Sequence, residues 1–312
     1  MRLKYLGGLM GFTIGNAVGF PLDSKNRADL LKKPVTKMLE NEEYNTPKGT
    51  WSDSTSLLIS TIDSINTKNG IDLDDIALKL VSYKTHSRYT ALNDVLDMDR
   101  TTSIAIDRYD NERKDPSSCG LTEEDTNTNG SLMRILPIAF YAIEKHLKDF
   151  EIRDLVRQIS SITHANDISV MGCYIFTRFV MFLLNGKDKY SAYSMTKCVD
   201  CTMFSEEAQE IYKRLLKEDI TKLKVNEINS TNHIVDTLES SFWVFLKSNS
   251  YKESIVGAIN LGGATSQIAA ITGSLAGIVY GYDLLPEEWE EKIALKDYLL
   301  DIFEEFSENK YE

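Results

Sequence analysis

Apolar residues recur at helical spacing along most of the chain. The i, i+3, i+4 pattern that marks one buried face of a helix repeats in ten segments, and no stretch shows convincing alternation of apolar and polar residues. The segments are residues 54–66, 73–82, 135–146, 152–163, 169–184, 205–217, 234–246, 251–259, 266–280 and 289–306. Asp72 and Ser205 stand where N-caps are expected, and Pro286 lies in the turn before the last segment. The pattern predicts an all-α fold.

The first twenty residues combine a basic start with an apolar run, which is also how a secretory signal begins. However, Gly7, Gly11, Gly15 and Gly19 recur at helical spacing, Asn16 interrupts the apolar run, and no A-x-A cleavage site follows. We therefore expect a buried first helix with a face of small residues. No other segment has enough consecutive apolar residues to suggest a membrane span.

Two polar stretches, residues 32–48 and 110–129, are expected to be loops. Neither has the low-complexity composition of a linker between domains, and no repeat of fixed period is evident. We therefore expect one domain spanning residues 1–312, with long functional loops.

Composition narrows the class of protein. The 47 acidic and 35 basic residues give a formal net charge of −12, which argues against non-specific attraction to nucleic acid or an anionic membrane. Four cysteines make no disulfide framework and favour a reducing, cytoplasmic setting. Cys198 and Cys201 have CxxC spacing, but no second CxxC or nearby histidine completes a zinc site, so a metal or redox role is weakly supported.

Four loops rich in Gly, Ser, Thr, Asn or Asp run directly into apolar helices. They are residues 15–23 (GNAVGFPLD), 49–55 (GTWSDST), 127–137 (NTNGSLMRILP) and 260–267 (NLGGATSQ). Each has an ordinary explanation, because Ser52 or Asp53 can cap a helix and Gly130 can permit a turn. Arg134 inside an apolar run is less ordinary. Its guanidinium needs an anionic or a carbonyl partner, and phosphate is one candidate.

Taken together and in order, these elements resemble the ADP-ribosylglycohydrolase family. The family's motifs are G-D-A-x-G-x-P-x-E, T-D-D-T, N-G-x-x-M-R-x-x-P, T-H, G-G-D-T-D-T, G-x-x-A-G-x-x-Y-G and P-x-x-W. The corresponding segments are residues 15–23, 52–55, 129–137, 163–164, 262–267, 273–281 and 286–289. The resemblance extends over nearly the whole chain, from Leu6 to Trp289.

The resemblance implies an all-α domain with a cleft for ADP-ribose, acting on ADP-ribosylated proteins. In the family, two Mg²⁺ ions on the cleft floor hold the ribose hydroxyls and activate water for cleavage of an N- or O-glycosidic bond. Carried onto this sequence, Asp53 and Asp23 are the candidate catalytic acids. The ligand-binding candidates are Asn129, Gly130, Met133, Arg134, His164, Gly262, Gly263 and Thr265.

The positions that match the family's metal ligands have lost most of their acids. They are occupied by Ser52, Asp53, Ser54, Ala264, Ser266 and Gln267. Asn16 stands for the Asp of the first motif, and Asp23 stands for its Glu. Because Mg²⁺ requires carboxylate oxygens in near-octahedral array, we expect its binding to be absent or weak.

Three histidines have ordinary alternatives to catalysis. His164 follows Thr163 at an expected helix end, where a supporting hydrogen bond is the favoured role. His86 and His233 lie on polar segments and are expected to be solvated. In the family, S-G-Y is common where this chain has residues 231–233, so the loop over the adenine or distal ribose is expected to differ.

Three further residues have two interpretations each. Asp99 replaces the Gly of the family's D-x-G-x-T-T element and either adds a carboxylate to the cleft or caps a helix. Trp51 and Tyr83 either stack on a base or belong to the core, and the core is the more common place for large aromatic residues.

Three hypotheses for function follow. The first is a pseudoenzyme that binds ADP-ribose, an ADP-ribosylated protein or a related nucleotide without efficient hydrolysis. The second is a divergent hydrolase, either metal-independent or using one ion held by Asp53 with Asp23 or Asp99. The third is a protein-interaction module whose cleft is occluded.

Overall fold

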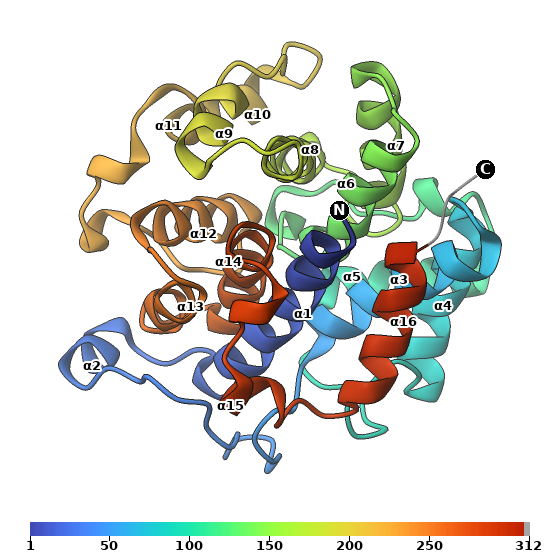
Figure 1. The fold of residues 1–312 in the computed structure, drawn as a ribbon. Helices are drawn as coiled ribbons and strands as arrows, with labels where there is room; N and C mark the ends of the chain where they lie inside the picture. Colours follow the sequence, from blue (N-terminus) through green and yellow to red (C-terminus); the bar gives the residue numbers. More distant parts are fainter. Residues whose placement is uncertain (309–312) are drawn as a thin grey trace.

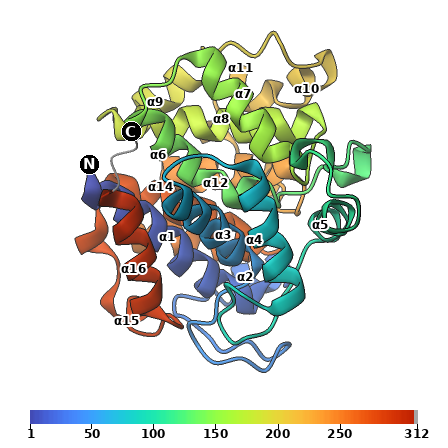
Figure 2. The same ribbon diagram turned by 90° about the vertical axis from the view of Figure 1, so that its right-hand side faces the viewer.

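The computed structural model describes residues 1–308, whose regular secondary structure is almost entirely helical (Figures 1 and 2). Within those residues, β pairing is limited to three isolated bridges. The α-helices are α1 (Arg2–Gly19), α2 (Arg27–Lys32), α3 (Asp53–Lys68), α4 (Leu73–His86), α5 (Arg100–Glu112), α6 (Leu136–Glu144), α7 (Asp149–Ser161), α8 (Asp167–Leu184), α9 (Lys189–Thr196), α10 (Glu206–Ile211), α11 (Lys213–Lys217), α12 (Ile234–Lys247), α13 (Tyr251–Ile259), α14 (Thr265–Tyr280), α15 (Glu287–Glu290) and α16 (Lys296–Glu308). The expected all-α fold is confirmed.

Helices α1 and α14 pack side by side through the middle of the molecule (Figure 1). A Cβ atom at Gly11 would lie 2.4 Å from the carbonyl oxygen of Gly273, and one at Gly15 would lie 2.1 Å from that of Ala269. Only glycine permits backbones to approach so closely. The glycine spacing of the first helix thus serves helix packing, as expected.

The two helices run antiparallel, because positions that advance along α1 face positions that recede along α14. The C-terminal end of α1 therefore meets the N-terminal end of α14. The start of α3 joins them, since Asn16 donates to Ser52 Oγ at 2.9 Å and accepts from the Ser52 backbone N–H at 2.9 Å. The end of α1 and the starts of α3 and α14, which are far apart in sequence, are thereby brought together; residues 15–23 end a helix instead of leading into one.

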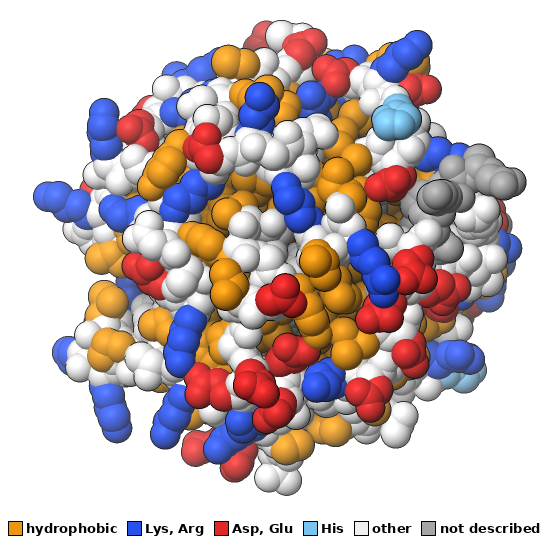
Figure 3. All heavy atoms as spheres, in the orientation of Figure 1, with side chains coloured by type: hydrophobic (Ala, Val, Ile, Leu, Met, Phe, Trp, Pro, Cys, Tyr) orange, Lys and Arg blue, Asp and Glu red, His pale blue; other side chains and the backbone are white. Residues whose placement is uncertain are grey.

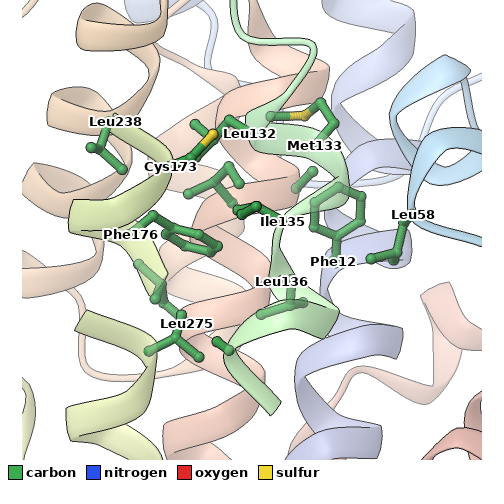
Figure 4. Close-up of a cluster of buried hydrophobic side chains, with 14 of the residues drawn as sticks. Phe12, Leu58, Leu132, Met133, Ile135, Leu136, Cys173, Phe176, Leu238 and Leu275 are labelled. Carbon is green, nitrogen blue, oxygen red and sulfur yellow. The ribbon is translucent and has the colours of Figure 1, made fainter. Parts of the chain in front are cut away.

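One hydrophobic core connects the elements. Figure 4 shows part of it, where Phe12, Leu136, Phe176 and Leu275 come from four different helices. Trp51 also belongs to this core. It is 1% exposed, and its indole N–H donates to the carbonyl of Ala294.

Eight of the ten helical segments expected from sequence are single helices, and two are broken. The segment 205–217 divides at Tyr212, whose buried hydroxyl donates to the carbonyl of Ile168. The segment 289–306 divides between α15 and α16, where Leu295 has a φ of 55°. There the N–H of Ala294 pairs with the carbonyl of Gly49 instead of continuing the helix. In both cases a tertiary contact outweighs the local pattern.

Helix caps agree with the sequence, but three helices match none of the ten periodic segments. The Asp72 side chain accepts from the N–H of Asp75, and Ser205 accepts from that of Ala208. The three helices are α2, α5 and α9, although one interpretation of Asp99 did predict a helix start at α5. The first and last of these have six and eight residues, too few for a periodic pattern to stand out.

Helix α8 is an exception to the expectation about membrane spans. Its 18 residues are long and apolar enough to cross a membrane by length and composition, with a mean hydropathy of 1.6. In this fold 83% of the helix is buried inside the protein, as in the core helix of a globular domain.

On the face of the molecule shown in Figure 3, acidic and basic side chains are interspersed.

Candidate functional site

A cavity of about 670 Å³ opens where the polar loops meet the helix ends. Its size suits a nucleotide-sized ligand. The lining side chains come from seven stretches of chain: Phe20, Asp23, Ser24, Glu43, Tyr44, Asp53, Asp97, Met98, Asp99, Arg100, Asn129, Ser230, Thr231, Asn232, Gly263, Ala264 and Gln267.

Asp23 follows α1 and reaches the start of α14. Its Oδ1 accepts from the backbone N–H of Ser266 at 2.8 Å and from Thr265 Oγ1 at 2.9 Å. It thereby caps a helix whose own N-cap residue, Ala264, has no hydrogen-bonding side chain. The other oxygen, Oδ2, is buried without a partner. Burial raises the pKa of Asp23 to about 7, against the opposing effect of the Ser266 hydrogen bonds.

Asp53 begins α3 and is 4% exposed on the cavity floor. Its Oδ1 lies 3.3 Å from the hydroxyls of both Ser52 and Ser54, which donate to it. Burial, then the charges of Asp97 and Asp99, raise the pKa of Asp53 well above its usual range. The two predicted catalytic acids, Asp23 and Asp53, therefore share one cavity.

Two more acids come from the segment before α5. Asp97 has a φ of 60°, and its Oδ1 accepts from the Tyr44 hydroxyl at 3.4 Å. Asp99 caps α5 by accepting from the N–H of Thr102, and its Oδ2 lies 3.6 Å from His164 Nε2. Both interpretations of Asp99 hold together, because it caps a helix and also adds a carboxyl group to the cavity.

His164 supports the cavity from behind. Its ring is fully buried, with Nε2 at 2.7 Å from Thr128 Oγ1 and Nδ1 at 2.7 Å from Thr163 Oγ1. Burial lowers the pKa of His164 to about 3, so the ring is neutral near pH 7. Gly130 leaves room for it, since a Cβ there would lie 2.9 Å from His164 Cε1. The supporting role expected of His164 matches these contacts.

Asn129 and the Gly262–Gly263 turn form the adjoining part of the wall. Asn129 lines the cavity while its Nδ2 donates to Thr237 Oγ1 at 2.9 Å. Gly262 and Gly263 each have a φ of 70°, which favours glycine at both positions. Gly263 lines the cavity, whereas Gly262 packs against the backbone of residues 25–27.

Arg134 and Met133 do not reach the cavity, contrary to the expectation of ligand contact. Arg134 is fully buried and donates to the carbonyls of Ile159 and Ser160, at 2.9 and 3.1 Å, where α7 ends. Of the two partners expected for Arg134, an anion or a carbonyl group, the structure shows carbonyl groups. These carbonyls are available because the last turn of a helix leaves them without intrahelical partners. Burial lowers the pKa of Arg134 to about 10. Met133 lies in the hydrophobic core (Figure 4).

Comparison with known proteins decides the family. The ADP-ribosylglycohydrolase family model matches residues 1–312. The chain belongs to the ADP-ribosylglycohydrolase family.

Three members of the ADP-ribosylglycohydrolase group illustrate the similarity. This chain is 26% identical over 305 residues to ADP-ribosylarginine hydrolase Tri1 of Serratia proteamaculans, covering 97% of this chain and 78% of the relative. It is 25% identical over 295 residues to ADP-ribosyl-(dinitrogen reductase) glycohydrolase of Rhodospirillum rubrum, covering 94% and 91%. The solved structure of an ADP-ribosylglycohydrolase-related protein complex matches with a TM-score of 0.83 at 20% identity, covering 99% and 98%.

The positions that match the family's metal ligands offer few carboxylate donors for two Mg²⁺ ions. Ser52 Oγ accepts from Asn16, Ala264 has no donor atom, and Ser266 brings a neutral hydroxyl that is buried without a partner. Ser54 donates to Asp53, and Gln267 brings only an amide to the cavity wall. Among residues 1–308, no three His, Cys, Asp or Glu side chains are grouped so that they could hold a metal ion.

Other candidates fall outside the site. Tyr83 is fully buried in the core, as its alternative interpretation expected, and His86 is exposed. His233 is only half-exposed, because its Nδ1 accepts from the N–H of Val235 and caps α12. Cys198 is exposed and Cys201 is buried, and neither thiol is bonded to another cysteine.

Glu43 and Tyr44 are cavity residues that sequence reasoning missed. They sit in the polar loop between α2 and α3, which carries no motif that points to chemistry. Tyr44 packs on Phe20 with ring centroids 5.1 Å apart, which fixes the loop over the cavity. This contact depends on the fold, so no local signal in the sequence reveals it.

Proposed function

We propose that this member of the family binds ADP-ribose or an ADP-ribosylated protein in the cavity, and has lost or strongly weakened two-metal hydrolysis. ADP-ribosylarginine is one candidate modification, because two Tri1 relatives carry it in their names. We also propose a cytoplasmic location, in keeping with four cysteines that are all free.

The observation that carries the proposal is the use of Asp23 as a helix cap. Where the family has carboxylates at the start of this helix, the chain has Ala264 and Ser266. The Asp23 oxygen that accepts from Ser266 N–H and Thr265 now satisfies the N-terminus of α14. In this proposal, the start of α14 is held by hydrogen bonds to Asp23, and Asp53 is the one carboxylate that remains at a position matching the family's metal ligands.

The cavity itself supports retained binding. It has a volume of about 670 Å³, and its lining combines aromatic and amide groups with Arg100 and the acidic residues Asp23, Glu43, Asp53, Asp97 and Asp99. An occluded cleft, as the interaction-module hypothesis requires, would not leave this space. No feature of the described residues favours that third hypothesis.

Calorimetric titration of ADP-ribose with excess Mg²⁺, and again with EDTA, tests the proposal. Equal binding under both conditions is the expected result. Binding only with Mg²⁺ would mean that the remaining oxygens still hold an ion, and absence of binding under both conditions would refute the proposed ligand.

Restoring the acids that the family has tests whether these positions correspond to the family's metal ligands. The variant S54D/A264D/S266D/Q267T should bind Mg²⁺ markedly more tightly than the wild-type protein, because three carboxylates join Asp53. A matched variant that changes only Gln267→Thr controls for the neutral replacement. A folded quadruple variant that ignores Mg²⁺ would show that these positions are not the ligand set.

A divergent, metal-independent hydrolase is the second candidate, and the acids favour it. Asp23 has a pKa of about 7, so its carboxyl group can hold or release a proton near neutral pH, and burial raises the pKa of Asp53 well above its usual range. Release of free ADP-ribose from ADP-ribosylarginine in EDTA, abolished in both D23N and D53N, would establish this alternative. Undetectable release would exclude it for that substrate.

A further inference from the structure

One guanidinium group joins three separate segments behind the cavity. Arg27, the first residue of α2, donates from Nε to the carbonyl of Leu261 at 2.6 Å. Its Nη1 donates to the carbonyls of Val225 and Ile228, at 2.7 and 2.5 Å, and its Nη2 donates to Ser230 Oγ at 2.7 Å. These acceptors are about two hundred residues away in sequence.

The segments that Arg27 joins continue directly into the cavity wall. Ser230, Thr231 and Asn232 form one side of this part of the wall, and Gly263 and Ala264 form the adjoining side. The two sides also contact each other, since the N–H of Ala264 donates to the carbonyl of Ser230 at 2.8 Å.

The contact between these two sides is close. A Cβ at Gly263 would lie 2.0 Å from the carbonyl oxygen of Ser230. Asn232 is tied in turn to Asn129, whose N–H donates to its carbonyl at 2.9 Å. A small displacement of residues 228–232 therefore changes the width of the cavity at several lining residues together.

We propose that Arg27 is a positioning residue for the ligand, acting through the wall formed by residues 228–232 and 261–264. Arg27 does not line the cavity, so it acts by fixing the backbone that does. The role rests on the proposed function, because the ligand whose affinity it sets is ADP-ribose.

The chemistry requires arginine at this position. A guanidinium presents five N–H donors in a rigid planar fork, whereas a lysine ammonium is a single compact centre with three donors. Four acceptors spread over two segments, residues 225–230 and Leu261, match the fork and exceed the reach of one ammonium. The fold does not depend on Arg27 alone, because Ile228 is 1% exposed and anchors the same segment in the core.

Ligand affinity is the first test. R27A and R27K should each bind ADP-ribose at least tenfold more weakly in EDTA, with melting temperatures within a few degrees of the wild-type protein. Millimolar methylguanidine should restore much of the affinity of R27A and none of that of R27K. The control is R2A, which loses a surface ion pair with Glu308 and should bind as the wild-type protein does.

Hydrogen exchange gives a second test that needs no ligand. The amide of Ala264, bonded to Ser230, should exchange faster in R27A, while amides in the middle of α8 should not change. Unchanged exchange at Ala264, or wild-type affinity in R27A, would overturn the role of Arg27. A loss of affinity matched by global unfolding and not restored by methylguanidine would also overturn it.

The two proposals fail in different ways. If the wild-type protein does not bind ADP-ribose, the proposed function is wrong, and hydrogen exchange still decides whether Arg27 positions the wall.

Discussion

At the scale of single residues, Asp23 and Arg134 show that the role of a side chain depends on the groups to which it is hydrogen-bonded. The same oxygen of Asp23 that would be free for chemistry instead caps α14, because Ala264 provides no cap of its own. Arg134 has a charge suited to phosphate, yet the carbonyls at the end of α7 use it. Residue type predicted the need for a partner at Arg134 and a candidate catalytic acid at Asp23, and only the fold decided which groups each one contacts.

Ionisation of Asp23 should make stability depend on pH. Its pKa rises from 3.8 in the unfolded chain to about 7 in the folded protein, so the folded state favours the protonated form. The contribution of protonated Asp23 to the free energy of unfolding is fully present below pH 3.8 and is lost as the pH rises toward 7. The loss is at most about 4 kcal/mol, because each tenfold change in the ionisation constant is worth about 1.36 kcal/mol.

D23N isolates this effect, since an amide can still accept from Ser266 N–H but does not ionise. Urea unfolding at pH 5 and pH 8 should show a smaller difference in stability for D23N than for the wild-type protein. Identical pH dependence in the two proteins would contradict the raised pKa.

Loss of Arg134 should affect stability rather than ligand affinity. R134A leaves several buried carbonyls unpaired and should lower the free energy of unfolding by about 3 kcal/mol or more. R134K, which keeps one donor centre, should lower the free energy of unfolding by less than R134A does. Calorimetry on the folded variants should give wild-type affinity for ADP-ribose. Stable R134K that no longer binds would mean that the guanidinium contacts the ligand.

At the scale of elements, the pairing of α1 with α14 creates the site. Because the helices are antiparallel and their backbones touch, the end of one places Asp23 beside the start of the other. The broken segments around Tyr212 and Leu295 show the converse, where a tertiary contact ends a helix that the local pattern would continue.

G15A tests the close packing of these helices. Alanine in place of glycine gains about 1 kcal/mol in helix propensity. However, the new Cβ would lie 2.1 Å from the Ala269 carbonyl oxygen, so the helices must separate. We expect a net loss of about 2 kcal/mol or more, since overpacking of this kind costs about 1–3 kcal/mol and here the backbone must move.

Chemical denaturation provides the measurement for this variant. G70A is the control, because a Cβ there would meet only Tyr141 Oη at 3.9 Å. Equal stability of G15A and the wild-type protein would show that α1 and α14 are less closely packed than described.

At the scale of the whole molecule, the cavity is assembled from seven stretches of chain and exists only in the folded state. A ligand that binds there must stabilise the fold by mass action. ADP-ribose at about one hundred times its dissociation constant should add about 2.7 kcal/mol to the free energy of unfolding. A thermal unfolding scan in EDTA measures this, and an unchanged midpoint at millimolar ADP-ribose would contradict binding in the folded state.

The sequence by itself determined the fold class, most helix positions and the family. Helical periodicity is a local property of the sequence. The order of the family's motifs can also be read from the sequence, without knowing which contacts their side chains make. The sequence also placed Asp23, Asp53 and Asn129 in one cleft, because the resemblance to the family implies that the motifs carrying them share a site. The loss of acids at Ala264 and Ser266 was likewise visible without a structure.

Only the tertiary structure decided how these residues are used. It turned Asp23 into the cap of α14, directed Arg134 to the end of α7, and brought Glu43 and Tyr44 over the cavity. It also gave Arg27 four acceptors drawn from distant segments. Hydrogen-bond partners and burial are set by contacts between residues far apart in the chain, and local sequence patterns carry no record of those contacts.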